Sequence, residues 1–478
     1  MAKAKKEILF VASEAAPFIA TGGLADVIGS LPKALAATKS FDVRVVLPLY
    51  EDVNAELRKD FRYLGNVNVR LAWRNQYCGY FEYKKDGVTF YFVDNEYYFK
   101  RHGCYGHYDD GERFAFFCKA ACELMSFIGF YPNVLHCHDW QAALAALYLK
   151  TYYCHRSEFS QIKAVFTIHN IEYQGRFSLD ILEDVFDISN AHRDLVEYEG
   201  CVNLMKGAIE CCERVSTVSP TYADEIKYSY FAHGLDSIIR RNEGKLCGIL
   251  NGIDYDYYNP STDTALAANY STEDASNKAV CKEQLQRMLN LPVKKDVPVV
   301  AMISRLASHK GLDLVQAVLE EFVATDDIQF VLLGTGEGEY EQFFRDLAAR
   351  HSDKVSANIV FNGNLSRKIY SGADLFLMPS KSEPCGLSQM IASRYGAVAI
   401  VRETGGLQDS IFPHGAGGNG FTFHNYNAHD MLYVLRQAVA VYHNKQEWNA
   451  LVTRAMNSDF SWSKSAANYG QMYLDMIK

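Results

Sequence analysis

The segment "VPVVAMIS" (297–304) is a short apolar run, and "GLDLVQAVLEEFVA" (311–324) after it has apolar residues at helical spacing. The alternation continues with "IQFVLLG" (328–334), "DLFLMPS" (374–380) and "AVAIV" (397–401), which are separated by helical segments. Short β-branched runs that alternate with helices are typical of βαβ units. The second half of the chain is therefore predicted to be α/β, with a doubly wound parallel sheet.

The first half repeats this rhythm, which predicts a second Rossmann-like domain. Its expected strands lie in "EILFVAS" (7–13), "DVRVVLPLY" (42–50), "NVLHCHDW" (133–140), "KAVFTIHN" (163–170) and "ERVSTVSP" (213–220). Aromatic alternation around Lys85-Asp86-Gly87 predicts a β-hairpin among them. We place the change of domain within "GKLCGILNGIDYDYYNP" (244–260), giving an N-terminal domain of residues 1–246 and a C-terminal domain of 247–462.

The composition excludes several classes of protein. A chain of 478 residues with a net charge of −9 lacks the basic surface that nucleic-acid binding requires. The 12 cysteines are scattered with no CxxC pair, so we expect reduced thiols in a cytoplasmic protein. No apolar run approaches the ~18 residues that would span a bilayer. We therefore expect no membrane partner.

Two glycine loops end strands and open helices, one in each predicted domain. They are Thr21-Gly22-Gly23 and Thr404-Gly405-Gly406, each followed by leucine. Glycine lets a backbone approach a ligand, and the first N–H groups of a helix favour an anion. A single such loop can be only a tight turn, but the pair predicts two cradles that face a diphosphate between the domains.

Charged residues follow two further strands of the second half. Arg305 and Lys310 come after 297–304, and Glu383 comes after 374–380. Arginine can hold phosphate oxygens through two N–H groups while lysine supplies a point charge. The alternatives are a solvated basic loop and a helix-start acid that the helix dipole stabilises.

A polar cluster closes two strands of the first half. Strand alternation puts His136 and His138 on one face, next to Asp139, and His169 follows the neighbouring strand. Because only a few ligands converge, we prefer a polar cluster around a sugar to a metal site. No GxSxG elbow supports a serine hydrolase, and "GTGEGE" (334–339) lacks the third glycine of a dinucleotide fingerprint.

The motifs TGGLADV, HDW, FTIHN, NGID, SRL-x3-KG, EPCGLSQ and TGGLQDS occur in this order between residues 21 and 410, within a likeness that runs from residue 7 to the last helix. In this the chain resembles bacterial glycogen synthases and plant starch synthases. The resemblance implies a GT-B fold with an interdomain active-site cleft and a C-terminal helix, 463–478, that packs back on the N-terminal domain. It implies retaining transfer of glucose from ADP-glucose to the nonreducing-end 4-OH of an α-1,4-glucan such as glycogen, with no cofactor and no metal.

The resemblance also assigns roles residue by residue. It implies that Arg305 and Lys310 neutralise the donor diphosphate, Glu383 contacts the glucose hydroxyls, and His169 and Asp139 act near the sugar or acceptor. The nucleotide-sugar-binding positions that it implies are Thr21, Gly22, Gly23, Tyr105, Asn251, Gly363, Cys385, Gly386, Leu387, Thr404, Gly405 and Gly406. No second carboxylate is placed as a nucleophile, so we expect substitution on one face of the sugar rather than a double displacement.

Two departures from the family pattern leave more than one function open. Ala20 stands where the family has lysine, and the loop after Gly363, with Asn364, reads a few residues shorter than usual and lacks the usual aromatic residue. That loop faces the nucleobase in the family, so UDP-glucose is the alternative donor. Transfer of glucose to a different acceptor and a catalytically weakened glucan-binding relative also stay compatible with the sequence.

Overall fold

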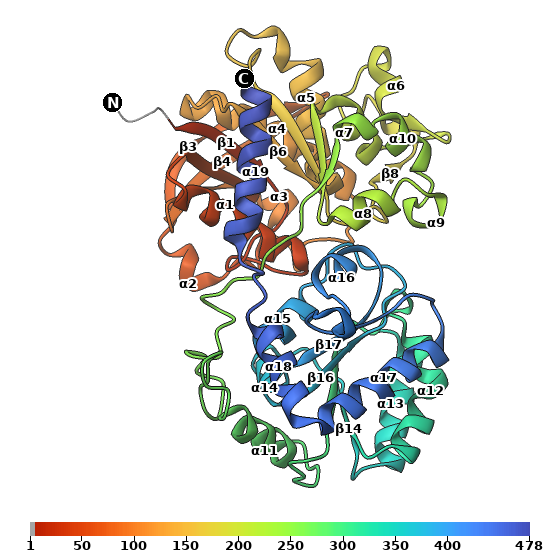
Figure 1. Ribbon diagram of the computed structural model, residues 1–478. Helices are drawn as coiled ribbons and strands as arrows, with labels where there is room; N and C mark the ends of the chain where they lie inside the picture. The colour runs from red at the N-terminus through yellow and green to blue at the C-terminus, as the bar shows by residue number, and fades with distance from the viewer. Residues whose placement is uncertain (1–4) are drawn as a thin grey trace. The chain divides into compact units, whose positions relative to one another are not determined.

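The computed structural model describes residues 5–478, which divide into two compact units. Unit 1 is Met1–Gly252 with Trp462–Lys478, and unit 2 is Ile253–Ser461. Each unit is a sheet flanked by helices (Figure 1). The α/β prediction with two Rossmann-like domains is therefore confirmed.

Unit 1 contains a nine-stranded sheet that is parallel except at one edge. Its order is β12 (Leu246–Gly248), β11 (Arg214–Thr217), β7 (Lys163–Ile168), β6 (Val134–His138), β1 (Lys6–Val11), β2 (Phe41–Pro48), β5 (Val88–Asp94), β4 (Arg74–Lys85) and β3 (Arg62–Leu71). The strands β4 and β5 form the predicted hairpin through Asp86 and Gly87, whose φ values of 52° and 79° are those of a hairpin turn. A small antiparallel sheet has the order β8 (Arg176–Phe177), β10 (Cys201–Asn203) and β9 (Glu197–Tyr198).

The helices of unit 1 follow its strands. They are α1 (Gly23–Ala37), α2 (Ala55–Arg58), α3 (Glu96–Phe99), α4 (Asp110–Ile128), α5 (Asp139–Thr151), α6 (Arg193–Val196), α7 (Leu204–Cys211), α8 (Pro220–Glu225), α9 (Ser229–Ala232), α10 (Asp236–Arg241) and α19 (Trp462–Ile477).

Unit 2 is built on a six-stranded parallel sheet. Its order is β15 (Val355–Asn358), β14 (Gln329–Leu333), β13 (Val299–Ile303), β16 (Leu375–Met378), β17 (Val398–Arg402) and β18 (Phe421–Phe423). Its helices are α11 (Lys278–Met288), α12 (Leu312–Thr325), α13 (Gly338–Arg350), α14 (Gly363–Gly372), α15 (Ser388–Arg394), α16 (Gly405–Ser410), α17 (Ala428–His443) and α18 (Lys445–Met456). Buried Val, Leu, Ile and Phe side chains of the strands pack against α12 and α17 to form its core.

The sequence predicted an N-terminal domain that ends at residue 246, but the boundary between the units lies a few residues later. Residues Leu246–Gly248 form β12, which pairs with β11 in the sheet of unit 1. The terminal helix α19 also belongs to unit 1, and its Ser465 donates a hydrogen bond to the carbonyl of Leu250 at 2.6 Å. The chain therefore leaves unit 1 only after Gly252.

Each sheet has one point where the strand order reverses. In unit 1, β1 lies between β2 and β6, and in unit 2, β13 lies between β14 and β16. Ligands of open α/β sheets bind outside the carboxyl ends of the strands at such a point. The loops after β1 and β6, and those after β13 and β16, are therefore the places to look for a site.

All 12 cysteines lie within the described residues and none forms a disulfide, as predicted. Among residues 5–478, no helix combines the length and the apolar character needed to cross a bilayer.

Candidate active site

The loop after β1 is organised around a buried carboxylate, Glu14. This side chain belongs to a residue that is only 3% exposed, and its Oε2 accepts hydrogen bonds from the backbone N–H of Thr21 at 2.5 Å and the hydroxyl of Thr21 at 2.8 Å. Burial raises the pKa of Glu14, and hydrogen bonds from Thr21, Tyr105 and the Gly22 backbone oppose that rise. The sequence had drawn attention to the glycines of this loop but not to the acid beneath them.

This arrangement changes the interpretation of the first glycine loop. Ala20 to Gly23 are exposed, and a Cβ added at Gly22 or Gly23 would meet nothing within 4 Å. However, loop N–H groups that an anion would need are directed at Glu14. A phosphate here would meet a carboxylate, so the loop of unit 1 is better suited to sugar hydroxyls than to a diphosphate.

Tyr105 reaches the same end of β1 from the segment between α3 and α4. Its hydroxyl lies 2.7 Å from the hydroxyl of Ser13, which precedes Glu14. Burial is the main cause that raises the pKa of Tyr105, and Glu14 adds to it. Ser13, Glu14, Thr21 and Tyr105 therefore form one connected polar group.

Asp139 opens α5 immediately after β6 with a left-handed backbone, at φ 56°. Such a conformation is unfavourable for a residue other than glycine and is concentrated at functional sites. It turns the carboxylate so that Oδ1 accepts the backbone N–H of His169 at 2.8 Å. Burial raises the pKa of Asp139 to about 7, against hydrogen bonds from the backbones of His169 and Asn170 that lower it.

His169 and His138 share a hydrogen bond. Nε2 of His169 lies 2.9 Å from Nδ1 of His138, whose other nitrogen, Nε2, is buried and has no partner among the described residues. Burial lowers the pKa of His169 to about 3, so the ring is neutral at pH 7. A neutral ring can orient a hydroxyl through a hydrogen bond but does not supply a fixed positive charge.

His136 is not hydrogen-bonded to His138 or His169, because both of its ring nitrogens have other partners. Its Nδ1 lies 2.7 Å from the Tyr473 hydroxyl on α19, and its Nε2 lies 2.6 Å from the Thr167 hydroxyl. Both ring nitrogens are therefore used in the interior of unit 1. Within residues 5–478, no three His, Cys, Asp or Glu side chains gather in a way that could hold a metal ion.

In unit 2, Lys310 and Glu383 meet where β13 and β16 end. Nζ of Lys310 lies 2.7 Å from Oε2 of Glu383, which also accepts the Ser380 hydroxyl at 2.9 Å. Glu383 is 7% exposed, so the pair is well shielded from water. Gly311, with φ 73°, is required beside it because a Cβ there would lie 2.1 Å from the carbonyl oxygen of Pro379.

Arg305 stands apart from this pair. It is exposed in the loop after β13 and forms no ion pair with any residue in the part of the chain that the structure describes. A guanidinium that is held near the sheet end and faces solvent is suited to an anionic ligand.

The second glycine loop packs against the corner that carries Glu383. Gly406 donates its N–H to the carbonyl of Glu383 at 3.2 Å, and a Cβ on Gly405 or Gly406 would lie 2.0 Å or 2.1 Å from the carbonyl oxygen of Glu383 or Cys385. Thr404 is fully buried. These glycines are therefore needed for packing against the corner that carries Glu383.

The EPCGL turn is itself locked from behind. Gly386 has φ 71°, and Nε2 of the buried Gln389 donates to the carbonyls of Cys385 and Gly386 at 3.1 and 2.9 Å. Leu387 follows as the residue before α15. The residues 383–387 and 404–406 thus form one rigid corner.

Asn251 and Gly363 lie in different surroundings. Asn251 is 5% exposed, and its Oδ1 is buried without a partner among residues 5–478. Gly363 is exposed as the first residue of α14, where Asn362 caps the helix by accepting the N–H of Leu365 at 2.9 Å. The nearby Phe361, which precedes Gly363, is 93% exposed.

A shallow depression of about 450 Å³ lies in unit 1 beside Ala20 and Thr21, with Asp52, Asn54 and Gly103 on its other walls. A larger depression of about 660 Å³ in unit 2, beside Arg287, contains none of the predicted site residues. The recess beside the first glycine loop therefore adjoins the expected chemistry.

Comparison with known proteins gives a consistent picture. Residues 7–241 match the starch synthase catalytic domain family and residues 287–450 match glycosyl transferases group 1. The chain is 48% identical to the glycogen synthase of Desulforamulus reducens over 98% of this chain and 99% of that protein. It is also 48% identical to the glycogen synthase of Geobacillus stearothermophilus, over 99% and 98%.

A solved structure extends the likeness to three dimensions. The catalytic domain of starch synthase IV from Arabidopsis thaliana, bound to ADP and acarbose, superposes with a TM-score of 0.92 and 33% identity. The match covers 99% of this chain and all of that one.

Proposed function

This chain belongs to the glycogen and starch synthase family of hexosyltransferases, and on that premise we propose that it transfers glucose from ADP-glucose to the nonreducing-end 4-OH of an α-1,4-glucan with retention of configuration. The observation that carries the proposal is the shielded Lys310–Glu383 pair at the sheet end of unit 2, with the exposed Arg305 in the same loop as Lys310, after β13. The plant relative, which is bound to ADP and acarbose, supports an adenine nucleotide and a glucan as the ligands.

We propose that unit 2 stabilises the leaving group. Lys310 has three donors and uses one on Glu383, so the others remain for the donor diphosphate while Glu383 accepts hydroxyls of the glucose. Arg305 adds a planar guanidinium for phosphate oxygens. Fixed cations that face the developing charge lower the barrier without a metal. The rigid corner of Cys385, Gly386, Leu387, Thr404, Gly405 and Gly406 holds Glu383 in place.

We propose that unit 1 positions the reacting sugar. The Asp139 carboxylate accepts hydrogen bonds from sugar hydroxyls, and the neutral His169 ring can donate or accept one. Tyr105 and the Thr21-Gly22-Gly23 loop complete the sugar contacts. The buried, unpartnered Oδ1 of Asn251 can accept a further hydroxyl. No residue of this set is arranged as a second nucleophile, so substitution on one face of the sugar is the mechanism that we favour.

The proposal is tested by measuring glucose incorporation into glycogen from ADP-glucose and UDP-glucose side by side, in the presence of a chelator. We expect turnover with ADP-glucose as the better donor. A preference for UDP-glucose would overturn the choice of base only. Donor consumption without elongation of glycogen would indicate a different acceptor, and binding of glycogen with no turnover would indicate a catalytically weakened relative, which Ala20 would help to explain. The free cysteines favour a reducing compartment such as the cytoplasm for this reaction.

Phe361 is expected to contribute to donor binding. Its ring is 93% exposed just before α14, close in sequence to Gly363, which is proposed to contact the nucleotide. Stacking of a base on an aromatic side chain contributes ~1–3 kcal/mol. Phe361→Ala should raise the KM for the nucleotide sugar by about tenfold, with kcat little changed. Tyr433→Ala, which removes another exposed ring of unit 2, is the control, and an equal effect of both changes would contradict the assignment.

A further inference from the structure

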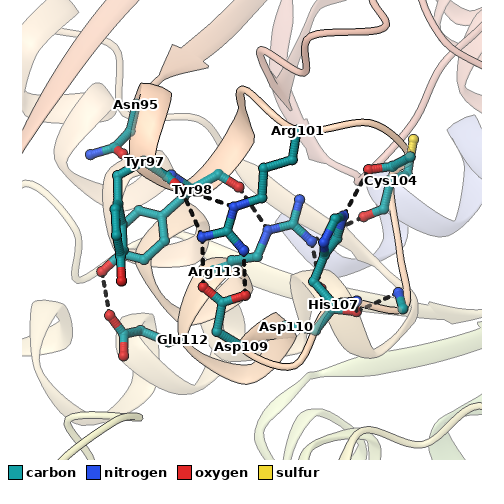
Figure 2. A network of polar contacts seen from close by, with 12 residues as sticks. Asn95, Tyr97, Tyr98, Arg101, Cys104, His107, Asp109, Asp110, Glu112 and Arg113 are labelled. Atoms are coloured by element: carbon teal, nitrogen blue, oxygen red, sulfur yellow. Dashed lines mark hydrogen bonds and ion pairs between the residues drawn. The ribbon is translucent and has the colours of Figure 1, made fainter.

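The segment between α3 and α4 carries Tyr105 and has irregular backbone. Gly103 and Gly106 on either side of the tyrosine have φ values of 81° and 87°, so the chain cannot form the hydrogen bonds of a helix or strand there. Backbone groups in such a segment need partners from side chains. Figure 2 shows the polar side chains that supply them.

Arg113 of α4 lies at the centre of this network. It is 0% exposed, its Nε donates to the carbonyl of Tyr98 at 2.7 Å, and its Nη1 donates to the carbonyl of Cys104 at 3.3 Å (Figure 2). The same Nη1 lies 2.5 Å from Oδ1 of Asp110. One guanidinium therefore ties the end of α3 to the residue that precedes Tyr105.

Asp110 extends this connection to the other side of the tyrosine. Its Oδ2 accepts the backbone N–H groups of Gly106 at 2.8 Å and His107 at 3.2 Å. Arg113 and Asp110 together thus hold the backbone on both sides of Tyr105, at Cys104 and at Gly106.

A second set of contacts also holds the segment between α3 and α4. Arg101 binds both carboxylate oxygens of Asp109, at 2.5 and 2.9 Å, and Asp52 accepts the N–H of Gly103 at 2.6 Å. The ring of His107 lies 3.2 Å from the carbonyl of Gly103. These side chains hold the segment through polar contacts rather than through apolar packing.

Burial of a guanidinium costs free energy unless hydrogen bonds to buried partners compensate for the lost hydration. An apolar side chain would fill the same space in α4 without removing a charge from water. What Arg113 adds is specific to the segment, because its backbone acceptors lie at the end of α3 and beside Tyr105.

We propose that Arg113, acting with Asp110, is a positioning residue that holds Tyr105 against Ser13 at the carboxyl end of β1. The proposal rests on the proposed function, in which Tyr105 contacts the donor sugar. Arg113 itself does not touch the sugar. It fixes the backbone from which the tyrosine hydroxyl reaches the site.

Thiol labelling tests the positioning without an activity assay. Cys104 is buried within the segment, and burial raises its pKa to about 12, so in the wild-type protein it should react slowly with N-ethylmaleimide. In Arg113→Lys, one ammonium cannot reach Tyr98, Cys104 and Asp110 together. We expect labelling of Cys104, followed by peptide mass spectrometry, to become about tenfold faster.

Two controls separate loosening of the segment from general unfolding. Cys122 in α4 is fully buried and should keep its slow labelling in every variant. Arg44→Lys removes a guanidinium from β2 that binds Asp42 and Tyr91, away from the segment, and should leave Cys104 protected. Unchanged labelling of Cys104 in Arg113→Lys would overturn the proposal.

A double-mutant cycle then tests whether Arg113 acts through the tyrosine. We expect Arg113→Lys and Tyr105→Phe each to lower kcat/KM for the nucleotide sugar, and the double variant to resemble Tyr105→Phe alone, because the two changes remove one function. Effects that multiply would mean that Arg113 acts by another route. Absence of turnover in the wild-type protein would refute the proposed function, and the labelling result would still decide whether Arg113 holds the segment.

Discussion

Replacement of Lys310 by alanine is expected to lower kcat by about 10²–10³-fold, which is the effect of removing one preorganised group that stabilises developing charge. The reason is the position of Nζ, 2.7 Å from Oε2 of Glu383, at the carboxyl end of the neighbouring strands β13 and β16. A diphosphate that leaves the sugar gains negative charge, and Lys310 supplies a cation in a shielded place. Initial rates with saturating donor and glycogen measure the loss.

The controls for this prediction separate catalysis from folding. Lys310→Ala leaves the buried Glu383 without its partner, which can cost about 3–5 kcal/mol of stability. The double variant Lys310→Ala with Glu383→Gln removes that unpaired charge, so it should regain stability but not activity. Lys282→Ala breaks an ion pair of equal length with Asp374 in the same unit and should reduce stability with little change in kcat. A Lys310→Ala enzyme within a few-fold of the wild-type kcat would contradict the assignment.

Replacement of Asp139 by asparagine is expected to lower kcat/KM by about 10–10²-fold above pH 7, because it replaces hydrogen bonds from a carboxylate by weaker ones. The pKa of about 7 also predicts a pH dependence. If the ionised form holds the sugar, the activity of the wild-type enzyme should fall as the pH drops below 7, and this step should vanish in Asp139→Asn. Glu7→Gln, at the opposite end of β1, is the matched control.

The same pKa predicts how stability changes with pH. The folded value of about 7 lies above the usual aspartate value of 3.8, so between these pH values the native protein holds a proton that the unfolded chain has lost. The free energy of unfolding should therefore fall as the pH rises from 4 to 7 and level off above 7, by about 2–4 kcal/mol from this group. Denaturant titrations of the wild type and Asp139→Asn measure the difference. A difference that does not change with pH would contradict the burial of this carboxylate.

The sequence predicted the two parallel sheets because buried strands are short, apolar and β-branched, whatever surrounds them. It also placed Lys310 and Glu383 at strand ends, because the loops that carry them have a recognisable composition. It could not predict their pairing, because the distance between residues 310 and 383 depends on which strands become neighbours in the sheet.

Other features were missed for equally physical reasons. In the sequence, Glu14 is a polar residue that follows an apolar strand, which is typical of a strand end. Only the fold of the next loop shows that Thr21 is hydrogen-bonded to the Glu14 carboxylate. The sequence assigned the second glycine loop to a ligand and did not show that the backbone of Glu383 and Cys385 also requires Gly405 and Gly406, because this contact joins two separate loops. The exposure of Phe361 could not be predicted, because an aromatic residue at the end of an apolar run is equally compatible with a core position.

The most direct measurement is the identification of the product formed from ADP-glucose and maltotriose in the presence of a chelator. We predict maltotetraose in which the new residue is joined at the nonreducing end by an α-1,4 bond, detected by its anomeric proton signal and by its digestion with β-amylase. A β-linked product would contradict retention of configuration. Failure to form any tetrasaccharide from either nucleotide sugar, by a protein that is folded, would contradict the assignment of glucan synthesis itself.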